Sequence, residues 1–479
     1  MPAAGPEGLA AVRARAVGRG RPDGDEESGG PRAGRDGGYT AGKEEAADVH
    51  CGGWAGWLVL RALMALLLLA LAKSVMKESG TTSVKMGVEG LGEAENGYVV
   101  RLQLANHHGC PKKPLRVEEG MGVGKTALVT GAAGLLGSHV SRYLVEYLGM
   151  RVVGVDNMSS GMEKNVLEHH NFQFHRGDFG DKRLLEKLFQ ENRIDVVYHT
   201  SEFASEVLSH FTRTFTYSTN LSKSVALLNA AITGRVKSFV YLSASAVYGD
   251  AAPPFHELAE PRPNDPYGIS KYAFELDLKA AARMFGLSYT IFRAGHLYGP
   301  HQNIGDRFHS VVGVFTRHVR NNETITIFGD GRQSRTFTYV EDVVQALSSA
   351  PLFAESRNQI FNLGGGEVHT MVSLAQEVGR AFGRVPKLDL TPQSKLKEEA
   401  ENTVDVSKMN CFFGTAAQTP LKDGLAQLAQ WLEEEQPDIH SHEPTELDIS
   451  EGLPAEWLQG SAMARRGSDA LGAWREVPR

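Results

Sequence analysis

Apolar and polar positions recur with two different periods along residues 121–297. Short apolar runs, typical of buried strands, occur at 125–130, 151–156, 172–176, 196–199, 238–243 and 288–293. Segments with the period of amphipathic helices lie between them, at 135–148, 182–192, 220–233 and 267–285. This alternation predicts an α/β protein with a doubly wound parallel sheet and helices on both faces.

The pattern changes on both sides of this region. After about residue 297 it becomes irregular, which predicts a smaller C-terminal substrate lobe. Large apolar residues are nearly absent from the first 53 residues, and the chain end is acidic, so we expect disorder in both. The expected organisation is a disordered leader at 1–53, a hydrophobic segment at 54–76, a linker at 77–120, a dinucleotide-binding domain at 121–297, the lobe at 298–435 and a disordered acidic tail at 436–479.

The hydrophobic segment contains the run WAGWLVLRALMALLLLALA at 54–72. Its length is about enough to span a bilayer, but Arg61 interrupts it. A membrane anchor, a cleaved signal and a segment without membrane role therefore all stay open.

Composition narrows the class of partner. The 479 residues include 50 basic and 57 acidic side chains, a net charge of −7 that gives no reason to expect a nucleic-acid partner. Three cysteines, Cys51, Cys110 and Cys411, lie far apart, so neither a disulfide framework nor a cysteine zinc site is expected. The histidines show no metal-ligand spacing, and we expect no metal site.

A glycine-rich turn follows the first strand. The sequence GAAGLLG at 131–137 precedes a helical pattern, and Asp156 ends the next strand 19 residues after Gly137. Such glycines allow a tight turn and a close approach of backbone amides to a pyrophosphate, and the acid binds the adenosine ribose. The combination predicts a Rossmann-type fold that binds NAD rather than NADP.

Further motifs extend beyond the cofactor turn. They include VTGAAGLLGSH (129–139), VVGVDNMSSG (152–161), SASAVYGD (243–250), PYGISK (266–271) and FGDGRQSRTFTYVEDVV (328–344). With them the chain resembles the extended short-chain dehydrogenase/reductases, in the nucleotide-sugar epimerase/dehydratase branch that includes UDP-glucose and UDP-glucuronate 4-epimerases. The resemblance covers 121–435 and implies an NAD-dependent epimerase, a UDP-sugar substrate and a homodimer.

The resemblance also implies the roles of individual residues. The pyrophosphate would lie on the turn, the adenosine ribose on Asp156 and Asn157, the adenine beside Asp178 and Phe179, and the nicotinamide ribose on Lys271. The turn residues are Gly131, Gly134, Leu135, Leu136 and Gly137.

Tyr267 and Lys271 form the Tyr-x-x-x-Lys pair of this family. Four residues apart, they share a helix face, and the ammonium favours the phenolate of a residue whose reference pKa is near 10. The pair would thus remove a proton from a sugar hydroxyl while NAD takes the hydride.

Ala244 departs from the family, which has Ser or Thr four residues before the Tyr of Val-Tyr-Gly. Ser243 and Ser245 flank it, but neighbours on a strand point to opposite faces, so neither replaces the hydroxyl without a backbone shift. An active enzyme using Ser243, Ser245 or water, and a catalytically weakened binding protein, both stay open.

The same loop separates reaction types. Dehydratases of the family place Asp-Glu, and decarboxylases a Glu, where this chain has Ser245 and Ala246. Epimerisation is therefore favoured over a dehydratase or decarboxylase reaction, which would need that acid.

Other residues concern the substrate and the location. Arg335 matches a diphosphate-binding arginine, and His296 replaces the diphosphate-binding asparagine. Glu202, where the family has alanine, would repel a charged sugar, but we expect a solvated loop residue. Asn157-Met-Ser is a glycosylation acceptor inside the expected cofactor site, which favours a cytoplasmic catalytic domain over a Golgi or endoplasmic-reticulum membrane protein.

Overall fold

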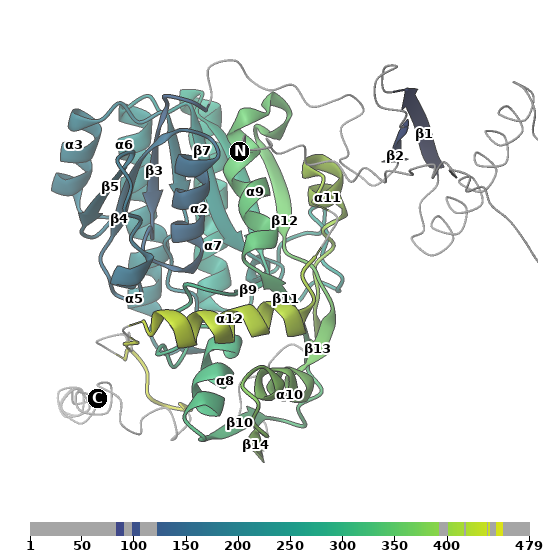
Figure 1. Ribbon diagram of the computed structural model, residues 1–479. Helices are drawn as coiled ribbons and strands as arrows, with labels where there is room; N and C mark the ends of the chain where they lie inside the picture. Colours follow the sequence, from purple (N-terminus) through teal and green to yellow (C-terminus); the bar gives the residue numbers. More distant parts are fainter. Residues whose placement is uncertain are drawn as a thin grey trace, which may run out of the picture. The chain divides into compact units, whose positions relative to one another are not determined.

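The computed structural model describes residues 83–90, 98–105, 122–391, 401–415, 418–437, 439–440 and 447–453 (Figure 1). The expectations for 1–53 and 54–76, including the membrane anchor, lie outside these residues. Among the described helices, none has the length and apolar character that crossing a bilayer requires.

A short hairpin, in a unit separate from the rest of the chain, falls within the expected linker. Strands β1 (Ser83–Gly90) and β2 (Tyr98–Ala105) pair antiparallel, with Val84 opposite Leu104 and Met86 opposite Leu102. The register thus aligns apolar with apolar positions. The expectation of a linker is wrong for these two segments, which form strands. Their apolar–polar alternation is too short to predict strands from the sequence.

Seven parallel strands form the main sheet, and their order confirms the expected fold class (Figure 1). The order is β12 (Gln359–Leu363), β8 (Ser288–Ala294), β7 (Ser238–Ala244), β6 (Val196–His199), β3 (Thr126–Thr130), β4 (Arg151–Asp156) and β5 (Phe172–Arg176). Chain order reverses at β3, which lies between β4 and β6. Ligands of doubly wound sheets bind at such a switch point, at the carboxyl ends of the strands.

Two apolar layers cover the two faces of this sheet. On one face pack α2 (Leu135–Glu146), α9 (Glu341–Ser349) and α11 (Ser407–Phe413). On the other pack α3 (Lys182–Glu191), α6 (Lys223–Thr233) and α7 (Pro266–Phe285). Because both faces are covered, the strands read as nearly continuous apolar runs, and all five residues of β3 are buried.

The C-terminal region forms a second apolar core. It contains β9 (His296–Tyr298), α8 (Val311–Arg320), β10 (Thr324–Phe328), β11 (Ser334–Tyr339), β13 (Val368–Thr370), α10 (Met371–Ala381), β14 (Lys387–Thr391), β15 (Glu401–Asn402) and α12 (Leu421–Glu435). However, β12 comes from the same stretch and pairs with β8 in the main sheet. Residues 298–435 therefore contribute to both the lobe and the sheet.

Short helices complete the chain. They are η1 (Glu163–Asn165), α4 (Glu206–Ser209), α5 (Arg213–Tyr217), the π-helix η2 (Ser218–Ser222), η3 (Ser245–Val247), η4 (Ala350–Leu352) and η5 (Ala354–Ser356).

Part of the expected disordered tail packs on the fold. The backbone N–H of Asp448 donates to the Phe211 carbonyl at 2.8 Å, and Leu447 and Leu453 pack against Phe211 and Phe203. Disorder is therefore the wrong interpretation for 447–453, because these apolar residues cover an aromatic cluster.

A buried ion pair joins α7 to β8. Arg293 donates to both carboxylate oxygens of Glu275, at 2.9 and 2.7 Å, and both side chains are almost completely buried. Burial opposes ionisation, but the hydrogen bonds and charge of Arg293 lower the pKa of Glu275.

Removing one charge of this pair should destabilise the fold strongly. We expect Glu275→Gln to lower the free energy of unfolding by about 3 kcal/mol, since it leaves a buried guanidinium uncompensated. Glu146→Gln, in the exposed Arg142–Glu146 pair, is the control and should cost less than about 1 kcal/mol. Denaturant unfolding measures both, and equal losses would contradict this account.

Candidate active site

One cavity of about 830 Å³ lies at the carboxyl ends of the strands. Its lining comes from the segments that follow β3, β4, β6, β7 and β8, and from α8, β10 and β11 of the C-terminal lobe. The volume is in the usual range for a small-molecule site, and its place at the switch point is the expected one.

The glycine turn forms one wall of this cavity. Gly131 has a φ of +72°, which favours glycine, and a Cβ on Gly137 would overlap the carbonyl oxygen of Gly131. Helix α2 then begins after Gly134 with no side-chain cap and no acidic residue in its first turn. Its first amides, including those of Leu135 and Leu136, are therefore suited to a pyrophosphate, and the turn fits the expected dinucleotide.

Asp156 is held at the end of β4 beside this turn. Its carboxylate accepts hydrogen bonds from the Ala133 amide at 3.0 Å and the Met158 amide at 2.8 Å. Burial raises its pKa, while these two bonds act in the opposite direction. Asp156 and Asn157 both line the cavity, as expected for ribose-binding residues.

Three expected cofactor residues, Asp178, Phe179 and Lys271, are not among those lining the cavity. Asp178 accepts from the Lys223 ammonium at 2.6 Å. Phe179 is buried in the apolar layer beneath the sheet, with its ring centroid 5.0 Å from that of His199. The structure therefore does not bring any of these three residues into the cavity that the glycine turn lines.

Helix α7 carries the Tyr-x-x-x-Lys pair. Asp265 caps the helix by accepting from the Gly268 amide, and Pro266 occupies its first position, where no N–H is needed. Tyr267 and Lys271 then follow one turn apart, and only 5% and 2% of their surfaces are exposed. The Lys271 ammonium donates to the Leu242 carbonyl at 2.5 Å.

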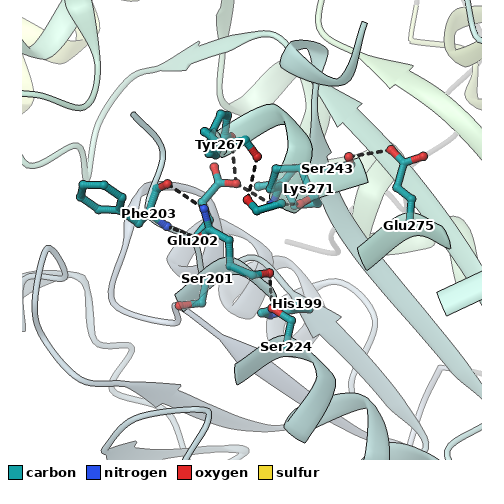
Figure 2. A network of polar contacts seen from close by, with 12 residues as sticks. His199, Ser201, Glu202, Phe203, Ser224, Ser243, Tyr267, Lys271 and Glu275 are labelled. Atoms are coloured by element: carbon teal, nitrogen blue, oxygen red, sulfur yellow. Dashed lines mark hydrogen bonds and ion pairs between the residues drawn. The ribbon is translucent and has the colours of Figure 1, made fainter. Parts of the chain in front are cut away.

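Glu202 contacts both members of this pair (Figure 2). Its Oε2 lies 2.7 Å from the Lys271 ammonium and accepts from the Tyr267 hydroxyl at 3.1 Å. Only 19% of its side chain is exposed. The expectation of a solvated loop residue is therefore wrong, because a buried ammonium needs a compensating anion.

The loop that carries Glu202 is fixed at several points. The Thr200 hydroxyl donates to the Thr130 carbonyl at 2.6 Å. Asn220 accepts from the Phe203 amide at 2.7 Å and donates to the Phe203 carbonyl at 3.0 Å. The sequence does not predict the role of Asn220, whose only signal is a polar residue at the expected start of an apolar helix.

The carboxylate changes the acid–base state of the pair. Burial, followed by the charges of Glu202 and Glu206, raises the pKa of Tyr267 well above its ordinary value. At neutral pH Tyr267 is thus a phenol that donates to Glu202, rather than the phenolate that the Tyr–Lys pattern alone suggests.

The end of β7 places the residues around Ala244. Ser243 points away from the pair and donates to Glu275 at 2.7 Å (Figure 2). Ala244 packs against Tyr267, in the position where the family has a hydroxyl. Ser245 is buried and lines the cavity. Of the two flanking serines, Ser245 is the one whose hydroxyl is not held by Glu275.

The C-terminal lobe lines the opposite part of the cavity with basic residues. Arg335 on β11 and Arg317 on α8 are among them. Burial, followed by the charge of Arg335, lowers the pKa of His296 to about 3, so this imidazole is neutral. Its Nε2 has no hydrogen-bond partner among the residues that the structure describes. Arg335 and His296 thus lie where a diphosphate could bind.

No group of three His, Cys, Asp or Glu side chains suited to a metal ion occurs in the described part of the chain.

The site defines a Rossmann-type dinucleotide-binding protein. It combines an uncapped helix after a glycine turn, an acid after the second strand and a Tyr–Lys pair.

Similarity to known proteins identifies a family within this class. A model of the NAD dependent epimerase/dehydratase family matches residues 127–364. Human dTDP-D-glucose 4,6-dehydratase is 29% identical over 334 residues, which cover 65% of this chain and 91% of that protein. The solved structure of a UDP-glucose 4-epimerase with UDP-glucose, from Thermotoga maritima, is 32% identical, with a TM-score of 0.60 over 65% of this chain and 99% of that one.

A second solved structure holds both a nucleotide sugar and a cofactor. It is the UDP-glucuronic acid 4-epimerase of Bacillus cereus in complex with UDP-glucuronic acid and NAD, with 26% identity, a TM-score of 0.59 and coverage of 65% of this chain and 99% of that one. The chain belongs to the NAD dependent epimerase/dehydratase family.

The charge of Glu202 should be measurable through Tyr267. We expect Glu202→Gln to lower the pKa of Tyr267, because it removes the largest charge acting against the phenolate. Tyrosinate absorbance is titrated in each background and compared with the same protein carrying Tyr267→Phe. Glu206→Gln is the control and should give a smaller shift in the same direction. Identical titrations for wild type and Glu202→Gln would refute this interpretation.

Proposed function

We propose that this protein is an NAD-dependent nucleotide-sugar 4-epimerase-like enzyme, acting on a UDP-sugar by transient oxidation at a sugar carbon. The observation that carries the proposal is that Tyr267 and the glycine turn line one cavity, with Lys271 one turn after Tyr267 on α7. The similarity to epimerases whose structures hold UDP-glucose or UDP-glucuronic acid supports the substrate class.

In this proposal the chain's own residues bind and orient the reactants. The first amides of α2 and Gly131 hold the pyrophosphate, Asp156 and Asn157 hold a ribose, and Arg335 and His296 contact the sugar diphosphate. NAD, when bound, supplies an acceptor and donor of hydride. Tyr267 passes its own proton to Glu202 while it takes the proton of the reacting hydroxyl as the carbonyl forms, and both transfers run in reverse when the carbonyl is reduced from the other face.

The residues before Tyr248 favour epimerisation over related reactions. Elimination of water or loss of carbon dioxide requires an additional acid, and Ser245 and Ala246 occupy the positions where such an acid would be expected. Both residues line the cavity, and neither carries a proton that can be transferred readily near neutral pH. A dehydratase or decarboxylase reaction is therefore the less favoured alternative.

A catalytically weakened protein that binds NAD or a nucleotide sugar is the second candidate. Two observations favour it. The methyl group of Ala244 lies against Tyr267 in place of a hydroxyl, and Glu202 holds Tyr267 in its phenol form. Both changes act on the step that moves the proton.

A panel of UDP-sugars distinguishes the two candidates. We expect the purified full chain to interconvert at least one pair of 4-epimers, measured by product chromatography together with the absorbance of bound cofactor. Ala244→Ser should raise kcat by about tenfold or more, because it adds a hydrogen-bond donor beside the reacting oxygen.

Ala226→Ser on α6 is the control, since it adds a hydroxyl outside the residues that line the cavity and should not raise kcat. A wild type that is inert while Ala244→Ser turns over would establish the weakened candidate. If both proteins leave every UDP-sugar unchanged, the epimerase proposal is wrong.

The assembly and the location stay predictions. We propose a homodimer, tested by sedimentation equilibrium, and a cytoplasmic catalytic unit, anchored or not by residues 54–72. Carbonate extraction of cell membranes tests the anchor: a chain that stays entirely in the soluble fraction has none. A chain carrying a glycan at Asn157 would instead support the Golgi or endoplasmic-reticulum alternative.

A further inference from the structure

We propose that Glu202 makes this site selective for sugars without a negative charge, so that UDP-hexoses bind in preference to UDP-hexuronates. The inference rests on the proposed function and names its substrate class. It follows from the place of one carboxylate and from the distribution of charge along the cavity.

The negative charge of Glu202 lies beside any sugar that is bound in position to react. A reacting hydroxyl must lie within hydrogen-bond reach of the Tyr267 hydroxyl, and Glu202 Oε2 is 3.1 Å from that same oxygen. In a 4-epimerisation the reacting carbon is bonded to the carbon that carries C6. A C6 carboxylate and Glu202 would therefore share one small, partly dehydrated volume, where charges interact strongly.

Glu202 cannot easily turn away from the sugar. Its neighbours Thr200 and Phe203 are hydrogen-bonded to Thr130 and Asn220. Its own carboxylate forms the ion pair with Lys271, which is 2% exposed. Moving Glu202 aside would leave that ammonium buried without its anion, at a high energetic cost.

The other charged groups near Glu202 do not offset its negative charge. Lys271 is already paired with it, so the cation that would attract a sugar carboxylate is neutralised. Glu206 on α4 adds a second negative charge that acts on Tyr267. In the loop before α8, His309 is paired with Asp306.

Basic side chains of the C-terminal lobe also line the cavity. Arg317 lies on α8, where burial and then the charge of Arg307 lower its pKa, and Arg335 lies on β11. A carboxylate beside Tyr267, together with basic residues of the lobe, suits a ligand whose negative charge is confined to the diphosphate and whose sugar is neutral.

Binding affinities test the proposal without requiring turnover. Isothermal titration calorimetry of the full chain at saturating NAD compares UDP-glucose, UDP-glucuronate and UDP. The two sugars differ only at C6, and UDP reports the nucleotide contacts alone. We expect wild type to bind UDP-glucuronate about tenfold more weakly than UDP-glucose. Glu202→Gln should reduce this ratio several-fold and leave UDP binding unchanged, whereas Glu202→Asp, which keeps the charge, should retain most of it.

Glu206→Gln is the matched control and should reduce the ratio less than Glu202→Gln does. Equal affinity of wild type for the two sugars, or a ratio that Glu202→Gln leaves unchanged, overturns the inference while the proposed function stands. If the wild type binds neither sugar nor UDP, the proposed function fails, and the inference fails with it. Should Glu202→Gln not fold, as judged by its thermal melt, the wild-type ratio together with Glu202→Ala decides the question.

Discussion

The ammonium of Lys271 is the charge on which this active site depends. It is almost completely buried on α7, and a charge in that setting must be paired and hydrogen-bonded. The chain satisfies it with the Leu242 carbonyl on β7 and with Glu202 after β6. The ion pair and the hydrogen bond of Lys271 thereby connect the ends of two neighbouring strands to the helix that carries Tyr267.

This pairing separates the site from a simple Tyr–Lys dyad. An unpaired Lys271 ammonium would stabilise a tyrosinate. Here it is paired with the Glu202 carboxylate, which also accepts a hydrogen bond from the Tyr267 hydroxyl. In the proposed mechanism, the missing hydroxyl at Ala244 acts on this same proton transfer. The cofactor end of the cavity, by contrast, keeps the glycine turn and the ribose acid in the arrangement that a dinucleotide needs.

The periodicity of the chain was sufficient to predict the main sheet. Strands β4, β5 and β6 have the expected bounds, because buried parallel strands give continuous apolar runs bounded by turns. The pair on α7 and the cavity contacts of Asp156 also followed from motifs. The ion pair of Glu202 did not, because Glu202 and Lys271 are 69 positions apart and an acid in a loop is usually solvated. The tail segment 447–453 was missed because its few apolar residues pack against phenylalanines far away in the sequence, and the hairpin was missed because its two strands are short.

A crystal structure of the sugar-free protein tests the central claim most directly. The account predicts that the Glu202 carboxylate lies within hydrogen-bond distance of both the Lys271 ammonium and the Tyr267 hydroxyl, with Ser243 bonded to Glu275 on the opposite side of β7. A Glu202 side chain turned into solvent, with Lys271 and Tyr267 in contact only with each other or with water, would contradict it.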